Sequence, residues 1–79
     1  MTQQEVYDQL QDIFDTVFMD YVGVTPSLTA NDVEEWDSLS HISLVLAIEE
    51  RFCIRFKVGE VESTQNVGEL ADLILRRIA

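Results

Sequence analysis

Apolar residues near the start of the chain recur with the period of an α-helix. They are Val6, Leu10, Ile13, Phe14, Val17 and Phe18. This spacing places them on one stripe of an amphipathic helix that faces a core. Thr2, followed three residues later by Glu5, forms a capping-box pattern, so we expect the helix to begin there. We expect it to end near Tyr21, because Gly23 and Pro26 follow closely.

Residues 22–36 show no regular period. Their loop- and turn-forming residues are Gly23, Pro26, Ser27, Thr29, Asn31 and Asp32. Four apolar residues should pin this loop to the core: Val24, Leu28, Val33 and Trp36. A loop of this length in a small domain is often functional or contains a short turn of its own.

A second helical segment, residues 37–52, has two apolar stripes instead of one. The stripe expected to face the core contains Leu44, Val45, Ile48 and Phe52. The opposite stripe contains Leu39, Ile42 and Leu46. A central helix buried on all sides is one explanation. Ser43 and Glu50 on one flank of the second stripe, and Glu49 on the other, favour an exposed surface that docks proteins.

The remaining residues complete a small helical fold. Residues 53–58 form a short link and are the only candidate for a strand, and residues 59–63 are expected to make one brief helical turn. Asn66 with Glu69 gives a capping pattern. A last amphipathic helix follows, with Val67, Leu70, Ala71, Ile74 and Ile78. The pattern predicts an all-α fold in one domain, residues 1–79: a small four-helix bundle with three main helices and one short helix.

Composition and charge narrow the possible functions. The chain has 79 residues, 47% of them hydrophobic, and carries 15 acids against five bases, for a net charge of −10. Such a surface repels nucleic acid and anionic membranes, whereas proteins with basic patches are suitable partners. A core of this size leaves little room to support a buried active site, which favours a binding or carrying role over catalysis.

The chain has the features expected of a cytoplasmic protein. Cys53 is the single cysteine and has no partner for an internal disulfide, which suggests a reducing compartment. The first ten residues lack the basic and apolar regions of a signal peptide. No apolar stretch approaches the length needed to span a membrane.

The start of the second helix has the chemistry of an anion site. Asp37 is the expected N-cap, and Ser38 follows it at the end of the exposed stripe. A phosphodiester on Ser38 would lie at the positive end of the helix dipole, near amide groups without helical partners. Taken alone, however, an Asp-Ser pair at this position is explained by plain capping.

Together, these features resemble the acyl carrier protein family. The resemblance rests on the start Asp37-Ser38-Leu39, the apolar pattern that follows, and the ending Glu49-Glu50 with Phe52 two residues later. It covers most of the chain, including the amphipathic first helix, the long loop and the final helix.

The resemblance implies a carrier and not an enzyme. Ser38 would receive 4′-phosphopantetheine from coenzyme A through a phosphopantetheinyl transferase, and Asp37 would assist the transferase near its metal ion. The thiol of this arm would hold acyl groups as thioesters, and the bundle core could shelter the acyl chain. The chain would be a monomer that docks acyl-loading and acyl-using enzymes. The docking residues would be Leu39, Ile42 and Leu46, with Glu49 and Glu50 meeting basic residues of the partner.

Several positions depart from the common family pattern. Glu34 and Glu35 replace a frequent Leu-Gly pair, Ser43 replaces a frequent acid, and Lys57, with Arg55 nearby, replaces a frequent proline. These changes leave the attachment site intact. They leave open which enzymes recognise the protein, and whether it serves fatty-acid, polyketide or specialised acyl metabolism.

Two other functions remain to be tested. One is an acidic helical interaction module that uses the same stripe but carries no arm on Ser38. The other is a small hydrolase using Asp37, Ser38 and His41, although no oxyanion-hole loop or strained elbow is visible. We expect His41 to be a helix-surface or boundary residue beside the attachment site.

Overall fold

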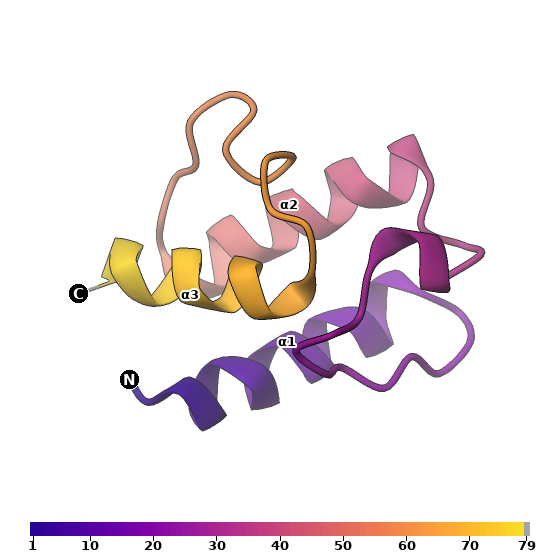
Figure 1. The fold of residues 1–79 in the computed structure, drawn as a ribbon, viewed down its shortest axis with the longest axis horizontal. Coiled ribbons are helices and arrows are strands. Elements are labelled where there is room, and N and C mark those ends of the chain that lie inside the picture. The colour runs from indigo at the N-terminus through magenta and orange to yellow at the C-terminus, as the bar shows by residue number, and fades with distance from the viewer. Residues whose placement is uncertain (79) are drawn as a thin grey trace.

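The computed structural model describes residues 1–78, which form an all-helical fold without strands among these residues (Figure 1). Helix α1 spans Gln3–Val17, the 3-10 turn η1 spans Ala30–Asp32, α2 spans Ser38–Phe52 and α3 spans Val67–Ile78. The predicted all-α fold and the three main helices are confirmed. None of these helices is long and apolar enough to cross a membrane.

Helix α1 begins as predicted but ends earlier. The Thr2 hydroxyl accepts a hydrogen bond from the Glu5 amide, and the Glu5 carboxylate accepts one from the Thr2 amide, which completes the capping box. The expected end near Tyr21 is wrong. Phe18 leaves the helix in an extended conformation and packs its ring 5.4 Å from that of Phe14 in the core.

The residues after Phe18 are held outside the helix by an acid from the loop. The two carboxylate oxygens of Glu35 accept hydrogen bonds from the amides of Met19 and Asp20, at 3.1 Å each. Glu35 is one of the residues that depart from the family pattern, and this contact gives it a structural role. Because it is 15 residues from Asp20 in sequence, the helical period could not reveal the pairing.

Helix α2 buries the face predicted to lie in the core. Leu44 and Ile48 are fully buried, Phe52 is 8% exposed and Val45 is half-buried. The helix ends at Cys53, which adopts a left-handed conformation with φ of 55°. This geometry lets the Ile54 amide donate a hydrogen bond to the Glu49 carbonyl at 3.0 Å. The bond gives a partner to one of the carbonyls of the last helical turn.

Helix α3 begins against the long loop. Asn66 caps it by accepting a hydrogen bond from the Glu69 amide at 2.9 Å, as the pattern predicted. The Gly68 amide donates to the Pro26 carbonyl at 2.9 Å. A Cβ at Gly68 would lie 3.0 Å from that same oxygen, so only glycine fits this close approach comfortably. The loop is pinned to the core as expected, with Val33 buried and Val24, Leu28 and Trp36 half-buried.

The link between α2 and α3 corrects one prediction. Residues 58–63 form consecutive turns, so the expected fourth, short helix is not present as a helix. One helical-type bond does form, from the Ser63 amide to the Gly59 carbonyl at 3.1 Å. Gly59 itself has φ of 80°, which a right-handed helix cannot accommodate, and the turns do not extend further.

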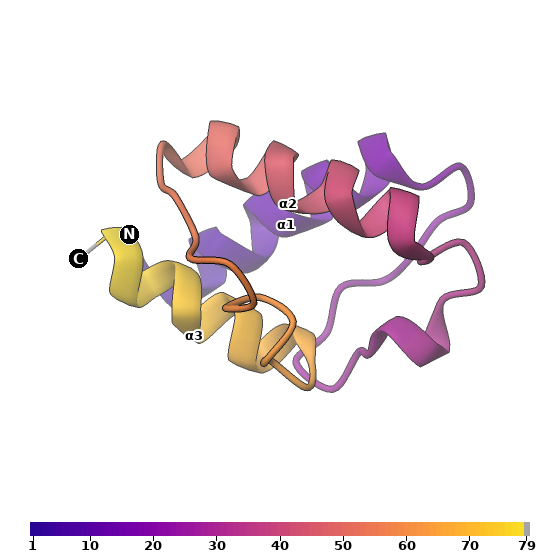
Figure 2. The same ribbon diagram turned by 90° about the horizontal axis from the view of Figure 1, so that it is seen from above.

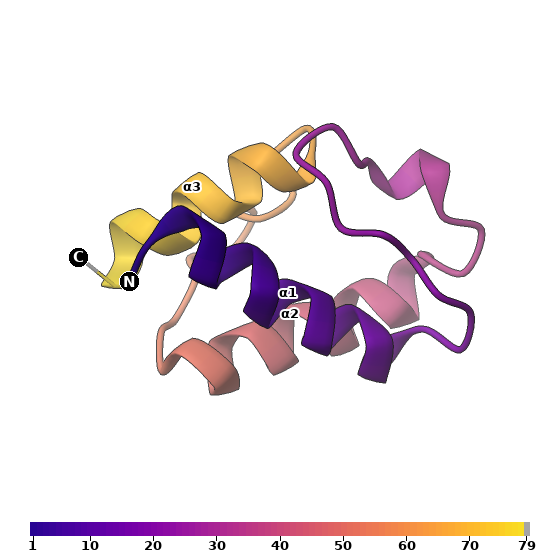
Figure 3. The same ribbon diagram turned by 90° about the horizontal axis from the view of Figure 1, so that it is seen from below.

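The elements meet around one core and leave two distinct ends. Helix α1 packs against both α2 and α3 (Figure 2). The start of α1 and the end of α3 lie side by side at one end, while the start of α2, η1 and the exit of α1 gather at the opposite end (Figure 3). The large side chains that are fully buried between the helices are Phe14, Leu10, Leu44, Ile48, Ile74, Val6 and Val67.

Candidate functional site

Ser38 is the first residue of α2 and is exposed. Asp37 caps the helix by accepting a hydrogen bond from the Ser40 amide at 2.9 Å. That bond is the main cause that lowers the pKa of Asp37 from its ordinary value of 3.8, because it stabilises the carboxylate. The Ser38 hydroxyl therefore stands in the open at the positive end of a well-capped helix, where a phosphodiester is electrostatically favoured.

A cleft of about 610 Å³ opens directly beside Ser38. Its walls come from residues 28–30 of the long loop, the first turns of α2, and residues 61–70. Its apolar lining includes Leu28, Val61, Val67 and Leu70. The volume lies within the range of roughly 300–1,000 Å³ of pockets that hold small ligands. An exposed serine next to an apolar cleft is an arrangement that suits a tethered group with an apolar chain.

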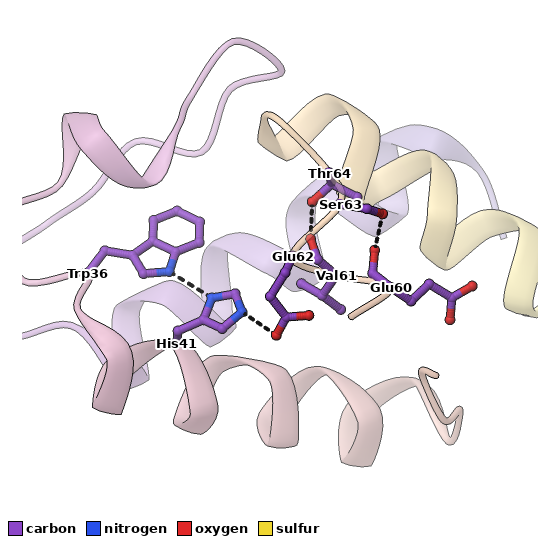
Figure 4. A network of polar contacts seen from close by, with 7 residues as sticks. All are labelled: Trp36, His41, Glu60, Val61, Glu62, Ser63 and Thr64. Atoms are coloured by element: carbon purple, nitrogen blue, oxygen red, sulfur yellow. Dashed lines mark hydrogen bonds and ion pairs between the residues drawn. The ribbon is translucent and has the colours of Figure 1, made fainter. Parts of the chain in front are cut away.

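A chain of polar contacts crosses this cleft (Figure 4). The Trp36 indole Nε1–H donates to His41 Nδ1 at 3.1 Å, and His41 Nε2 lies 3.2 Å from Glu62 Oε1. The Trp36 and His41 rings are stacked, with centroids 6.3 Å apart and planes 21° apart. We call these three residues the Trp36–His41–Glu62 bridge. His41 is a boundary residue beside Ser38, as predicted, but its link to Glu62 spans 21 residues and has no signature in the sequence.

The second stripe of α2 lies on the surface. Leu39 is 77% exposed, and Ile42 and Leu46 are each 56% exposed. Ser43 and Glu50 beside them are also exposed. The alternative of a helix buried on all sides is therefore wrong, and the stripe extends from Ser38 along the free face of α2.

Glu49 does not join this exposed surface. Its side chain is only 12% exposed. One carboxylate oxygen accepts a hydrogen bond from the Phe56 amide at 2.8 Å, and the other lies 3.8 Å from Arg55 Nη1. Glu49 thus fastens the link after α2 to the helix. The expectation that it meets basic residues of a partner requires correction, because its carboxylate is already engaged within the chain.

The geometry does not assemble a hydrolase. Both ring nitrogens of His41 are engaged, one with Trp36 and the other with Glu62, so this ring is not positioned as a base for Ser38. Among residues 1–78, no three His, Cys, Asp or Glu side chains gather closely enough to hold a metal ion.

Comparisons with known proteins agree with the geometry. No protein-family model matches the chain. An acyl carrier protein of Guillardia theta is 32% identical over 100% of this chain and 99% of its own length. One from Acidothermus cellulolyticus is 31% identical over 94% of this chain and 89% of its own length.

A solved structure is also similar. The solution structure of a holo acyl carrier protein from Geobacter metallireducens superimposes with a TM-score of 0.84 at 40% identity. The match covers 92% of this chain and 85% of that one. Carrier function without catalysis, and a phosphopantetheine prosthetic group, are properties of such proteins. The chain belongs to the acyl carrier protein family.

Proposed function

We propose that Ser38 holds the 4′-phosphopantetheine arm, on which the protein carries acyl groups as thioesters. The observation that carries this proposal is an exposed serine at the positive end of α2, beside an apolar cleft. During attachment, the Ser38 oxygen would form a bond to the phosphorus that bears pantetheine. The pyrophosphate bond of coenzyme A would break, 3′,5′-ADP would leave, and the hydroxyl proton would pass to a base of the transferase.

The cleft supports an acyl cargo in particular. Leu28, Val67 and Leu70 offer apolar surface within reach of a chain that enters beside Ser38. Withdrawing apolar carbon atoms from water is favourable, at about 0.8 kcal/mol for each methylene group. The cleft would therefore shelter the acyl chain, while the phosphodiester stays in solvent at the tip of α2.

The exposed stripe supports docking to basic enzymes. Leu39, Ile42 and Leu46 would supply apolar contact, and Glu50 would supply negative charge at the rim. Asp37 would face the metal ion of the phosphopantetheinyl transferase. The net charge of −10 would accelerate encounters with partners that carry basic patches. We further propose that residues 1–79 act as a single carrier domain, monomeric and cytoplasmic.

Intact mass spectrometry tests the attachment. The protein is incubated with coenzyme A, magnesium and a broad-specificity phosphopantetheinyl transferase, and then weighed. We expect wild type to gain one arm and Ser38→Ala to gain none. Ser43→Ala is the matched control, because it removes an exposed hydroxyl from the same helix and should still be modified. An unmodified wild type would instead favour an interaction module that uses the stripe without an arm.

The pathway calls for a second measurement. We propose an acyl group from fatty-acid, polyketide or specialised acyl metabolism. The mass of the group bound to the protein isolated from its own cells would distinguish these three.

A further inference from the structure

The Trp36–His41–Glu62 bridge lies at the place where the carrier proposal puts the cargo. All three residues line the cleft beside Ser38. His41 stands on α2, three residues after Ser38, and Glu62 belongs to the turns before α3. Figure 4 shows the His41 ring rising from α2 between the side chains of Trp36 and Glu62. The bridge therefore connects the α2 wall of the cleft to the wall formed by residues 61–70.

This connection is the polar side-chain contact between the α2 wall of the cleft and the wall formed by the turns. Within the described part of the chain, the bond from His41 Nε2 to Glu62 Oε1 is the one side-chain hydrogen bond between α2 and residues 58–66. The other hydrogen bonds of the turns are made locally or to α3. Widening the cleft between α2 and the turns thus requires this contact to break.

The chemistry of the bridge fixes how the His41 ring is used. An indole N–H can only donate, so Nδ1 of His41 must accept from Trp36. In the neutral ring the proton then lies on Nε2 and is donated to Glu62. The His41 side chain is 25% exposed and that of Glu62 is 59% exposed, so water competes for this bond. Such a contact is of modest strength and can open when a ligand occupies the space behind it.

We propose that the Trp36–His41–Glu62 bridge is a gate of the cleft and determines which acyl chains it shelters. Short acyl groups leave the bridge closed and remain in solvent. Longer apolar chains gain enough buried surface to separate His41 from Glu62 and enter. His41 and Glu62 are in this sense specificity-determining residues for the cargo. The proposal rests on the carrier function proposed above, and its tests are arranged to separate the two.

The first test uses the protein without an arm. The single tryptophan gives one indole N–H resonance, and its exchange with solvent reports directly on the bond to His41. We expect Glu62→Ala to free the His41 ring and speed this exchange roughly two- to tenfold, as the loss of one exposed hydrogen bond allows. Glu62→Gln keeps an acceptor oxygen and should stay close to wild type. Equal exchange rates in wild type and Glu62→Ala would overturn the bridge as a gate.

Asp72→Ala is the matched control for charge. Asp72 is an exposed acid on α3, outside the residues that line the cleft, so its removal changes the net charge by the same amount as Glu62→Ala. The indole exchange rate should not respond to it. An effect of Asp72→Ala as large as that of Glu62→Ala would assign the change to overall charge and contradict the gate.

The second test uses protein loaded with either an acetyl or an octanoyl thioester, with loading verified by intact mass. Cleavage of the thioester by hydroxylamine measures how well the cargo is sheltered. We expect the octanoyl half-life in Glu62→Ala to exceed that in wild type about two- to tenfold, because the bridge no longer has to open. The acetyl half-lives should be equal. Equal octanoyl half-lives would refute the gate while leaving the carrier function intact.

Failure of the carrier proposal would give a different set of results from failure of the gate. A wild-type protein that gains no arm would refute attachment at Ser38, whereas indole exchange would still show whether the bridge holds the cleft closed. A mass gain at Ser38 with no effect of Glu62→Ala in either test would refute the gate alone.

Discussion

Helices α1 and α2 are equally long, at 15 residues each, but they use their apolar residues differently. The main stripe of α1 is buried almost completely, with Val6, Leu10 and Phe14 inaccessible to solvent. Helix α2 buries one stripe and leaves a second, from Leu39 to Leu46, on the surface. Burying a large apolar side chain is worth roughly 1.5–3 kcal/mol, and the isolated protein does not gain this from the second stripe. A partner that covers the stripe can gain it, which is why we propose docking on α2 and not on α1.

A pair of substitutions, one on each face of α2, tests this difference between the buried and exposed stripes most strongly. Leu44 is fully buried, and Leu44→Ala should lower the free energy of unfolding by about 2–5 kcal/mol, through lost apolar contact and the cavity left behind. That is a large part of the stability of a small domain. Urea unfolding followed by circular dichroism measures the loss.

The second member of the pair is Leu46→Glu on the exposed face. Leu46 is 56% exposed, so its replacement should change the free energy of unfolding by about 0.5 kcal/mol or less. The same variant should slow transfer of the arm or of acyl groups by partner enzymes, because it places a charge in the apolar contact. A collapsed circular dichroism spectrum of Leu46→Glu would show that the second stripe belongs to the core after all.

An effect smaller than that of Leu44→Ala is expected for Gln11, on the polar face of α1, which helps to hold the long loop in place. The Gln11 amide donates to the Val22 carbonyl at 2.8 Å and accepts from the Val24 amide at 3.0 Å, both partly buried. Gln11→Ala leaves these two loop groups without their partner. We expect it to lower the free energy of unfolding by about 1–3 kcal/mol in urea titrations.

Gln4 provides the control on the same helix. Its amide donates to the Asp8 carboxylate at 2.9 Å on the exposed surface, so Gln4→Ala should cost about 0.5 kcal/mol or less. Similar losses for the two variants would mean that Gln11 acts only as a helix surface residue. In that case the loop would be held by its other contacts, among them the buried Val33 and the hydrogen bond from the Gly68 amide to the Pro26 carbonyl.

The sequence predicted the elements well because their signals are local. The caps at Thr2, Asp37 and Asn66 and the buried stripes all depend on spacings of three or four residues, which a single helix imposes. The early end of α1 could not be predicted in this way, because Glu35, from another part of the chain, holds the residues after Phe18.

In the candidate site, too, local features could be predicted and long-range contacts could not. The stripe could be located from the helical period, and Ser38 from the capping pattern and the family resemblance. The structure places Ser38 at the tip of α2 and the stripe on its free face. The Trp36–His41–Glu62 bridge joins residues 21 apart across a cleft and depends on how the chain folds back. The helical period predicted that Glu49 is an exposed acid, but its carboxylate accepts a hydrogen bond from the Phe56 amide in the link after α2.

The starts of the two helices differ as well, and this difference predicts the smallest effect. The N-terminus of α1 has a reciprocal capping box, with two hydrogen bonds between Thr2 and Glu5. The N-terminus of α2 is capped by the Asp37 side chain alone, and Ser38 is exposed. The hydrogen bond from the Ser40 amide lowers the pKa of Asp37 from 3.8, so folding favours its charged form. The stability contributed by Asp37 is therefore fully present above its unfolded pKa and is lost as the pH falls through its lower, folded pKa.

Asp37→Asn isolates this contribution, because asparagine also caps helices but does not titrate. The free energies of unfolding of wild type and Asp37→Asn, measured in urea from pH 7 downward, should differ by a constant amount until about pH 5. Below the ordinary pKa of 3.8 the difference should shift against wild type, because only wild type loses a charged cap. A difference that stays constant throughout the acid range would show that Ser40 does not bond the ionised form. The charge of Asp37 would then add nothing to the strength of the cap. The helix dipole alone would favour an anion at Ser38.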